Sequence, residues 1–203
     1  FMVLGWKPFL VLGWQPFMVP FEPLSTVGRS LGLWQPPDIR ISPSVPPIPG
    51  IDSEHVVDST GILNRETLPD HLIIVGGGVI GCEFACMYAS VDIPVTVLEA
   101  MPEICPNLDP EVAAVLREEL TKKGVNFKLD TKVESIDPKS VSFANADGSD
   151  SLEGDLVLVA TGRTPNTKGL GLEELGLDID PRGGVRADDR GATSVPGLWA
   201  AGD

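Results

Sequence analysis

The stretch that decides the fold is His71-Leu-Ile-Ile-Val-Gly-Gly-Gly-Val-Ile-Gly81. It opens with a short apolar run, typical of a strand that is buried on both faces of a sheet. The run leads directly into Gly76-Gly77-Gly78-Val79-Ile80-Gly81, which fits the pattern G-x-G-x-x-G. A helix is expected from Val79 to about Val91. A strand, a glycine turn and a helix in this order predict the start of a Rossmann-type unit.

The spacing of the three glycines suits a dinucleotide. Gly76 permits the tight turn, Gly78 lets the backbone approach a pyrophosphate, and Gly81 allows the helix to pack closely on the strand. The pyrophosphate would then lie at the helix N-terminus, where free N–H groups and a partial positive charge receive it. The motif by itself leaves both NAD and FAD open as the dinucleotide.

An acidic residue stands where such a unit needs one. Glu99 follows the second expected strand, Val95–Leu98, and its carboxylate would accept hydrogen bonds from the adenosine ribose hydroxyls. It would repel the 2′-phosphate of NADP, and the next residues, Ala100-Met101-Pro102, include no arginine. The sequence therefore favours NAD over NADP.

Working outward, strands and helices alternate. A helix is predicted between the N-cap Asp109 and Gly124, since acidic residues near its start and lysines at its end suit the helix dipole. The remaining expected elements are a third strand at Val125–Leu129, a small antiparallel meander with strands at Lys132–Ile136, at Ser140–Phe143 and before Asp155, and a fourth buried strand at Asp155–Ala160. The fold class is α/β, a Rossmann-type parallel sheet with an inserted antiparallel β-meander.

An irregular Pro/Trp-rich segment precedes this unit. It carries an eight-residue repeat that begins at Phe1, Phe9 and Phe17, and proline at every eighth residue forbids a long helix. Short β-like pieces are expected there, either as an aromatic contact strip or as an extension foreign to the rest of the chain. The predicted organisation is this segment at 1–44, a linker at 45–70, the NAD-binding domain at 71–162 and a return segment at 163–203.

Composition narrows the function. The net charge of −14 argues against nucleic acid and acidic membrane surfaces as partners. Three cysteines form no closed disulfide set; Cys82 and Cys86 are read as small buried residues, with a redox pair or metal clip as the alternative. With only two histidines no metal site is expected. A reducing, cytoplasmic location fits best, and no signal peptide or membrane span is expected.

Three motifs in order carry a family resemblance. They are His71–Glu99, the run Asp155-Leu-Val-Leu-Val-Ala-Thr-Gly-Arg-Thr-Pro-Asn166, and the run Thr193-Ser-Val-Pro-Gly-Leu-Trp-Ala-Ala-Gly-Asp203. Together they resemble the flavoprotein disulfide reductases, and dihydrolipoamide dehydrogenase above all. The resemblance covers about residues 46–203 and implies that the glycine motif is the family's second one, which holds the nicotinamide cofactor.

The resemblance also implies roles for individual residues. Gly76, Gly78 and Gly81 would cradle the pyrophosphate, and Glu99 would hold the ribose. Glu83 would lie near the nicotinamide carboxamide and Val133 near the adenine, although a helix-surface charge and a meander core residue explain these two equally well. Gly162 would approach the nicotinamide, and Asp203 would bind the ribityl chain of FAD.

The departures from the family pattern limit these expectations. The redox disulfide, the first glycine motif for FAD and the catalytic His-Glu pair are not found in this sequence, so no catalytic residue is assigned. The chain is expected to bind NAD, to position nicotinamide for hydride exchange with FAD in a complete family enzyme, and not to hold FAD itself. Two alternatives stay open: a diaphorase-like NADH oxidoreductase, and a non-catalytic binding or self-associating module. Self-association is expected in either case.

Overall fold

The computed structural model describes residues 41–200, and the chain divides into two compact units. One unit comprises residues 43–163, and the other comprises residues 1–42 and 164–203. The chain passes between the units at two short strands, β1 (Ile41–Pro43) and β10 (Arg163–Pro165), which form a two-stranded sheet.

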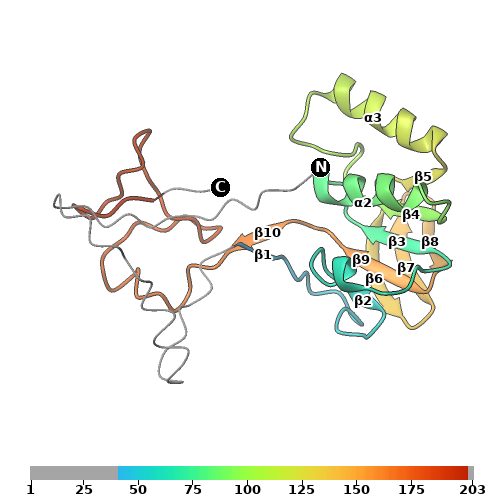
Figure 1. The fold of residues 1–203 in the computed structure, drawn as a ribbon, viewed down its shortest axis with the longest axis horizontal. Coiled ribbons are helices and arrows are strands. Elements are labelled where there is room, and N and C mark those ends of the chain that lie inside the picture. The colour runs from blue at the N-terminus through green and yellow to red at the C-terminus, as the bar shows by residue number, and fades with distance from the viewer. Residues whose placement is uncertain (1–40, 201–203) are drawn as a thin grey trace. The chain divides into compact units, whose positions relative to one another are not determined.

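A parallel sheet of five strands forms the centre of unit 43–163 (Figure 1). Its strands share one direction and lie in the order β2 (Val56–Val57), β9 (Leu156–Val159), β3 (Leu72–Val75), β4 (Val95–Leu98) and β5 (Val125–Lys128). Every residue of β3, β4 and β9 is buried, which explains why these strands are continuous apolar runs in the sequence. The predicted parallel sheet is confirmed, with strand ends within one residue of the expected ones.

The two faces of this sheet are covered differently. Leu72 and Ile74 point to the face that packs against helices α2 (Val79–Ala89) and α3 (Pro110–Lys122). Ile73 and Val75 point to the opposite face, where their partners include Phe143. That face is covered by the predicted meander, an antiparallel sheet of β6 (Lys132–Asp137), β7 (Ser140–Asn145) and β8 (Gly148–Glu153) (Figure 1).

Both helices begin and end for local reasons. The side chain of Asp109 accepts a hydrogen bond from the N–H of Glu111, and Pro110 takes the first position of α3. Gly124 follows the end of α3 with φ +95°, a conformation that glycine adopts without strain. Helix α2 stops at Ala89, two residues before the predicted end, because Ser90 closes its last turn by hydrogen bonds to Cys86 and the next turn needs the left-handed φ of Asp92.

Two short elements in residues 45–70 were not predicted. They are β2, which extends the parallel sheet beside β9, and a 3-10 turn at Ile62–Asn64 that buries Ile62. A two-residue strand has no periodicity, so its place depends on pairing with a distant strand.

In the second unit, the described residues after β10, residues 166–200, form turns and isolated β-bridges. The bridges join Ile179 to Val185, Ala187 to Thr193 and Ala192 to Trp199. The β-like pieces predicted in the Pro/Trp-rich segment and the predicted FAD contact Asp203 lie outside the described residues. Within residues 41–200, no helix combines the length and the hydropathy that a bilayer crossing requires.

Candidate dinucleotide site

The glycine turn lies where β3 ends and α2 begins. Gly76 has φ +106°, and a Cβ atom there would come within 2.7 Å of the carbonyl oxygen of Ala160 on the neighbouring β9 connection. Only glycine therefore fits at this position. The turn lies at the carboxyl ends of adjacent parallel strands, the edge at which open α/β sheets bind ligands.

The other two motif glycines face different surroundings. A Cβ atom at Gly81 would overlap the carbonyl oxygen of Gly76, so the helix crosses the strand end too closely for a side chain. A Cβ atom at Gly78 would meet no atom within 4 Å, and the φ of Gly78 is an ordinary −71°. Neither the backbone conformation nor the packing of the protein demands glycine at Gly78. What the missing side chain leaves is open access to the start of α2.

The start of α2 is not capped by the chain. Gly78 provides no side-chain hydrogen bond, and the first turn contains no acidic residue. Helix α3 is the opposite case, with the Asp109 cap and Glu111 in its first turn. An uncapped N-terminus beside an open surface keeps N–H groups available for an external anion.

Glu99 lies directly after β4 and faces the glycine turn. It is 8% exposed, its Oε2 accepts a hydrogen bond of 2.5 Å from the N–H of Gly77, and its Oε1 accepts one of 2.8 Å from the N–H of Met101. Each carboxylate oxygen retains capacity for a further hydrogen bond, so the group can still receive hydroxyl donors. No ion pair to Glu99 is found within residues 41–200.

The connection after β5 holds the backbone of Glu99, a contact that the sequence did not predict. The N–H of Glu99 donates to Lys128, and its carbonyl oxygen accepts from the N–H of buried Thr131 at 2.8 Å. The Oγ1 of Thr131 in turn donates to Leu129 at 2.8 Å. An Asp-Thr pair at the end of a strand signals a turn. That turn signal was the indication in the sequence that Thr131 lies at this edge of the sheet and supports the site.

The remaining predicted site residues take varied positions. Glu83 is exposed on α2, one turn into the helix and two residues after the glycine motif. Gly162 is exposed after β9, has φ +123°, and its carbonyl oxygen accepts from the N–H of Ser44. Val133 is buried, 9% exposed, among the apolar residues between the meander and the sheet. The structure brings the three glycines and Glu99 together, and the roles of Glu83, Val133 and Gly162 stay predictions.

An ion pair fixes the loop that follows Glu99. Arg117 on α3 donates to both oxygens of Glu103, at 2.8 and 3.0 Å. The hydrogen bond from Arg117 lowers the pKa of the Glu103 carboxyl below its ordinary value, against a small opposing effect of burial. The cation of Arg117 is thereby held by Glu103, a neighbour of the candidate ribose carboxylate.

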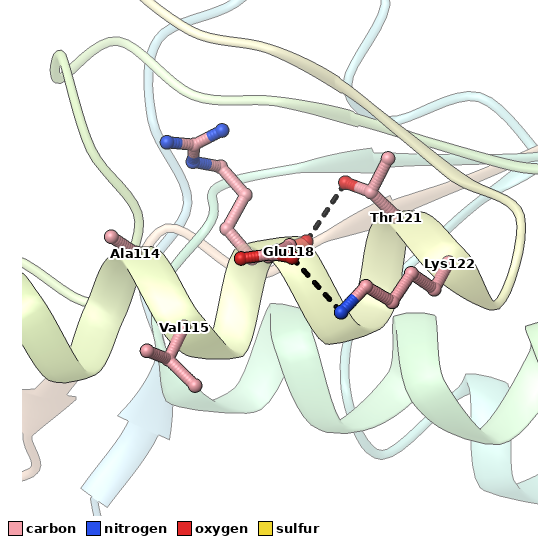
Figure 2. Close-up of a pocket in the computed structure, with 6 residues that line it drawn as sticks. Ala114, Val115, Glu118, Thr121 and Lys122 are labelled. Carbon is pink, nitrogen blue, oxygen red and sulfur yellow. Dashed lines mark hydrogen bonds and ion pairs between the residues drawn. The ribbon is translucent and has the colours of Figure 1, made fainter.

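A surface hollow of about 440 Å³ lies elsewhere, along the outer side of α3 (Figure 2). In it Lys122 pairs with Glu118 at 2.9 Å, and the hydroxyl of Thr121 donates to the carbonyl of Arg117. The hollow is lined by residues of one helix, namely Ala114, Val115, Arg117, Glu118, Thr121 and Lys122. It shares no lining residue with the glycine turn, and a one-sided helix surface lacks the convergent groups of a ligand site. Within residues 41–200 no three potential ligands gather into a metal site either.

The family model of the pyridine nucleotide-disulphide oxidoreductases matches residues 41–203. The chain belongs to this family. The predicted resemblance is thus confirmed, and the oxidoreductase and flavoprotein character of the family agrees with it.

Relatives of this family show how much of a complete protein is present. Dihydrolipoyl dehydrogenase 3 of Pseudomonas putida is 44% identical over 165 residues, which are 77% of this chain and 35% of the relative. The HOCl-induced flavoprotein disulfide reductase RclA of Escherichia coli, in its Cu(II) complex, has a TM-score of 0.72 at 39% identity, covering 80% of this chain and 37% of that one. The chain thus spans about a third of the length of these relatives.

A third similar structure is an engineered water-forming NADPH oxidase bound to NADPH. It has a TM-score of 0.69 at 27% identity and covers 80% of this chain and 37% of its own. Its substitutions include a consecutive aspartate, alanine and methionine replaced by alanine, arginine and serine.

Proposed function

We propose that unit 43–163 is the NAD(H)-binding part of a dihydrolipoamide dehydrogenase-like flavoprotein oxidoreductase. The observation that carries this proposal is the pairing of two features at one sheet edge. Gly78 opens the uncapped start of α2, and the buried carboxylate of Glu99 lies at the same turn, bonded to Gly77. A pyrophosphate fits the first feature and a ribose diol fits the second, so a dinucleotide satisfies both.

The partial positive charge at the start of α2 supports the assignment of the diphosphate to this position. The chain has a net charge of −14, so a dianion needs a local reason to bind. The N–H groups and the partial positive charge at the start of α2 provide that reason without a lysine or arginine. Backbone recognition of this kind fits the free space at Gly78, because a side chain there would keep the phosphates away from the N–H groups.

Glu99 provides the basis for choosing NAD over NADP. A carboxylate opposite the ribose would repel a 2′-phosphate, and the guanidinium of Arg117 is already paired with the carboxylate of Glu103. In this chain Glu99 is followed by Ala100 and Met101, the same order of acid, alanine and methionine that was replaced in the NADPH-bound engineered oxidase. That parallel supports a role for these three residues in excluding the 2′-phosphate.

NADH supplies a hydride, that is, two electrons and one proton, to an acceptor such as a flavin. The proposed work of this chain is to bind and orient the cofactor. The glycine turn fixes the pyrophosphate, Glu99 fixes the adenosine end, and Glu83 and Gly162 are proposed to border the nicotinamide end. Val133 is proposed to border the adenine side through its backbone, since its side chain is buried in the core.

Titration with NADH and NADPH side by side tests the proposal. We expect NADH to bind more tightly than NADPH, and Glu99→Ala to weaken NADH by about tenfold and to narrow the difference, because a hydrogen bond to a charged group contributes about 1.5–3 kcal/mol. Glu153→Ala, which removes an exposed glutamate on β8, is the matched control and should leave both affinities unchanged. Equal affinity of the parent chain for the two cofactors would contradict the assignment.

A further inference from the structure

Two buried thiols lie directly beneath the glycine turn. Cys82, in the first turn of α2, and Cys105, in the connection between β4 and α3, have their Sγ atoms 3.8 Å apart. They are 4% and 2% exposed, and both are free thiols. The third cysteine, Cys86, is also free and only partly buried.

Both cysteines hold the same peptide of the turn. The carbonyl oxygen of Gly77 accepts the N–H of Cys105 at 2.9 Å and the Sγ of Cys82 at 3.4 Å. The N–H of Gly77 donates to Glu99. A change in the position of the Cys82 sulfur or of the Cys105 backbone is therefore transmitted through Gly77 to the carboxylate of the candidate ribose site.

We propose that Cys82 and Cys105 form a reversible intramolecular disulfide under low-molecular-weight disulfide oxidants, and that this bond weakens dinucleotide binding at the glycine turn. The second half of the proposal rests on the proposed NAD(H) site, and the first half does not. This pair differs from the family's redox disulfide, because its two cysteines follow the second glycine motif and lie 23 positions apart.

Geometry allows the bond and predicts its effect. A disulfide has an S–S length of about 2.05 Å, so the two sulfurs must approach each other by somewhat less than about 2 Å. Cys82 is fixed in a helix, whereas Cys105 lies in a connection. The φ of Cys105 is +47°, in the left-handed region that residues other than glycine rarely adopt. The connection is therefore the part that moves, and its movement disturbs the bond between Cys105 and Gly77.

The chemistry has a defined order. Burial, together with Cys105, Glu99 and Glu103, raises the pKa of the Cys82 thiol well above its ordinary value, so Cys82 is not the first nucleophile. After local opening of the connection, the Cys105 thiolate attacks the small disulfide, forms a mixed disulfide and releases one small thiol. The Cys82 thiolate then displaces the second small thiol. Two protein thiols are oxidised, one small disulfide is reduced to two thiols, and the two protons pass to those thiols.

Cleavage after glutamate distinguishes every possible pairing. Glu66, Glu83, Glu99, Glu103 and Glu111 divide this region so that the three cysteines fall on separate peptides, 67–83, 84–99 and 104–111. The full chain is incubated with oxidised glutathione, alkylated, unfolded, digested and analysed by mass spectrometry. We expect a disulfide to join peptides 67–83 and 104–111, and we expect this joint to disappear on reduction. A joint that involves 84–99, or no joint between 67–83 and 104–111, overturns the proposal.

Two alanine variants separate the pair from the third thiol. Cys86→Ala should form the same joint to the same extent, and Cys105→Ala should not form it. If the Cys105 variant does not fold, the mapped joint in the parent chain still decides the first half, since it needs no variant.

NADH binding decides the second half. We expect the oxidised chain to bind NADH about tenfold more weakly than the reduced chain, and saturating NADH to oppose oxidation by the same factor, which corresponds to about 30 mV for a two-electron couple. Equal affinity in both redox states overturns the coupling. A reduced chain that binds no NADH refutes the proposed function instead, and the peptide map then still tests the disulfide.

Discussion

At the scale of single residues, the three motif glycines differ in what the fold requires of them. Gly76 is required by its backbone conformation and Gly81 by the packing of helix on strand. Gly78 is required by neither, because the space next to it is open. This difference separates what the motif contributes to folding from the contribution to dinucleotide binding that we propose for it.

Alanine at Gly81 should therefore lower the stability of the chain, whereas alanine at Gly78 should lower its affinity for NADH. Gly81→Ala places a methyl group on the carbonyl of Gly76, and we expect a loss of about 3 kcal/mol in the free energy of unfolding. Gly78→Ala should change that free energy by no more than about 1 kcal/mol, the range of an N-cap substitution, and weaken NADH more than about tenfold by blocking the approach to the start of α2. Denaturant unfolding and NADH titration measure both variants. Unchanged NADH affinity in Gly78→Ala would contradict the assigned phosphate position.

The sequence predicted the positions of the candidate site residues in the fold better than it predicted their hydrogen-bond partners. The positions of Gly76, Gly81 and Glu99 follow from a local pattern, because strand, turn and helix impose their own spacing. The hydrogen bond from Gly77 to Glu99 and the support from Thr131 join segments distant in sequence, and no periodicity encodes such contacts.

At the scale of elements, short polar contacts fix the strand ends. The Asp155 carboxylate precedes β9 and accepts the N–H groups of His71 at 2.8 Å and Asp70 at 3.1 Å, at the start of β3. Desolvation opposes the charge on Asp155, but the backbone hydrogen bonds from His71, Asp70 and Asp155 itself, together with the charge of His71, outweigh it and lower its pKa below the ordinary 3.8. The apolar runs predicted both strands, but the pairing of β3 with β9 and the contact of Asp155 with His71 join segments 84 positions apart, which no local pattern predicts.

Removing this carboxylate should have a pH-dependent effect. Because the pKa of Asp155 is lower in the folded chain, its contribution is complete above the ordinary carboxyl pKa and is lost as pH falls through the lowered one. We expect Asp155→Ala to cost about 1 kcal/mol at neutral pH, a small value because the group is exposed, and the difference from the parent to vanish in acid. Asp150→Ala, on exposed β8, is the control. A difference that persists unchanged at low pH would show that the effect is not electrostatic.

At the scale of the whole molecule, α2 has apolar residues on its outer side as well as on the side facing the sheet. Val79 and Met87 are 57% and 48% exposed, and Val91, just beyond the helix, is 53% exposed. Their spacing of eight and four residues places them along one side of the helix direction. Exposed Glu83 lies between Val79 and Met87 and is the one charged residue of α2, and a helix with so few polar residues is typical of one that another surface covers.

We expect the chain to associate with itself through this side of α2. Burying about 500 Å² of apolar surface yields roughly 12 kcal/mol at about 25 cal/mol per Å², and association costs about 4 kcal/mol or more, so the dissociation constant is about micromolar at its tightest. The net charge of −14 opposes association weakly, since screening at physiological salt limits repulsion to about 8 Å. Sedimentation between about 1 and about 100 μM should show the transition.

A lysine substitution at each of two exposed apolar residues, Met87 and Leu68, tests whether α2 is the contact. Met87→Lys puts a charge into the proposed contact, and we expect it to raise the dissociation constant by about tenfold or more, the effect of an unpaired charge at the centre of an apolar contact. Leu68→Lys makes the same change in net charge at a residue that is 63% exposed and precedes β3, so it should leave association unchanged. If both variants associate like the parent, α2 is not the contact. A parent chain that stays monomeric across the whole dilution series would contradict the predicted self-association.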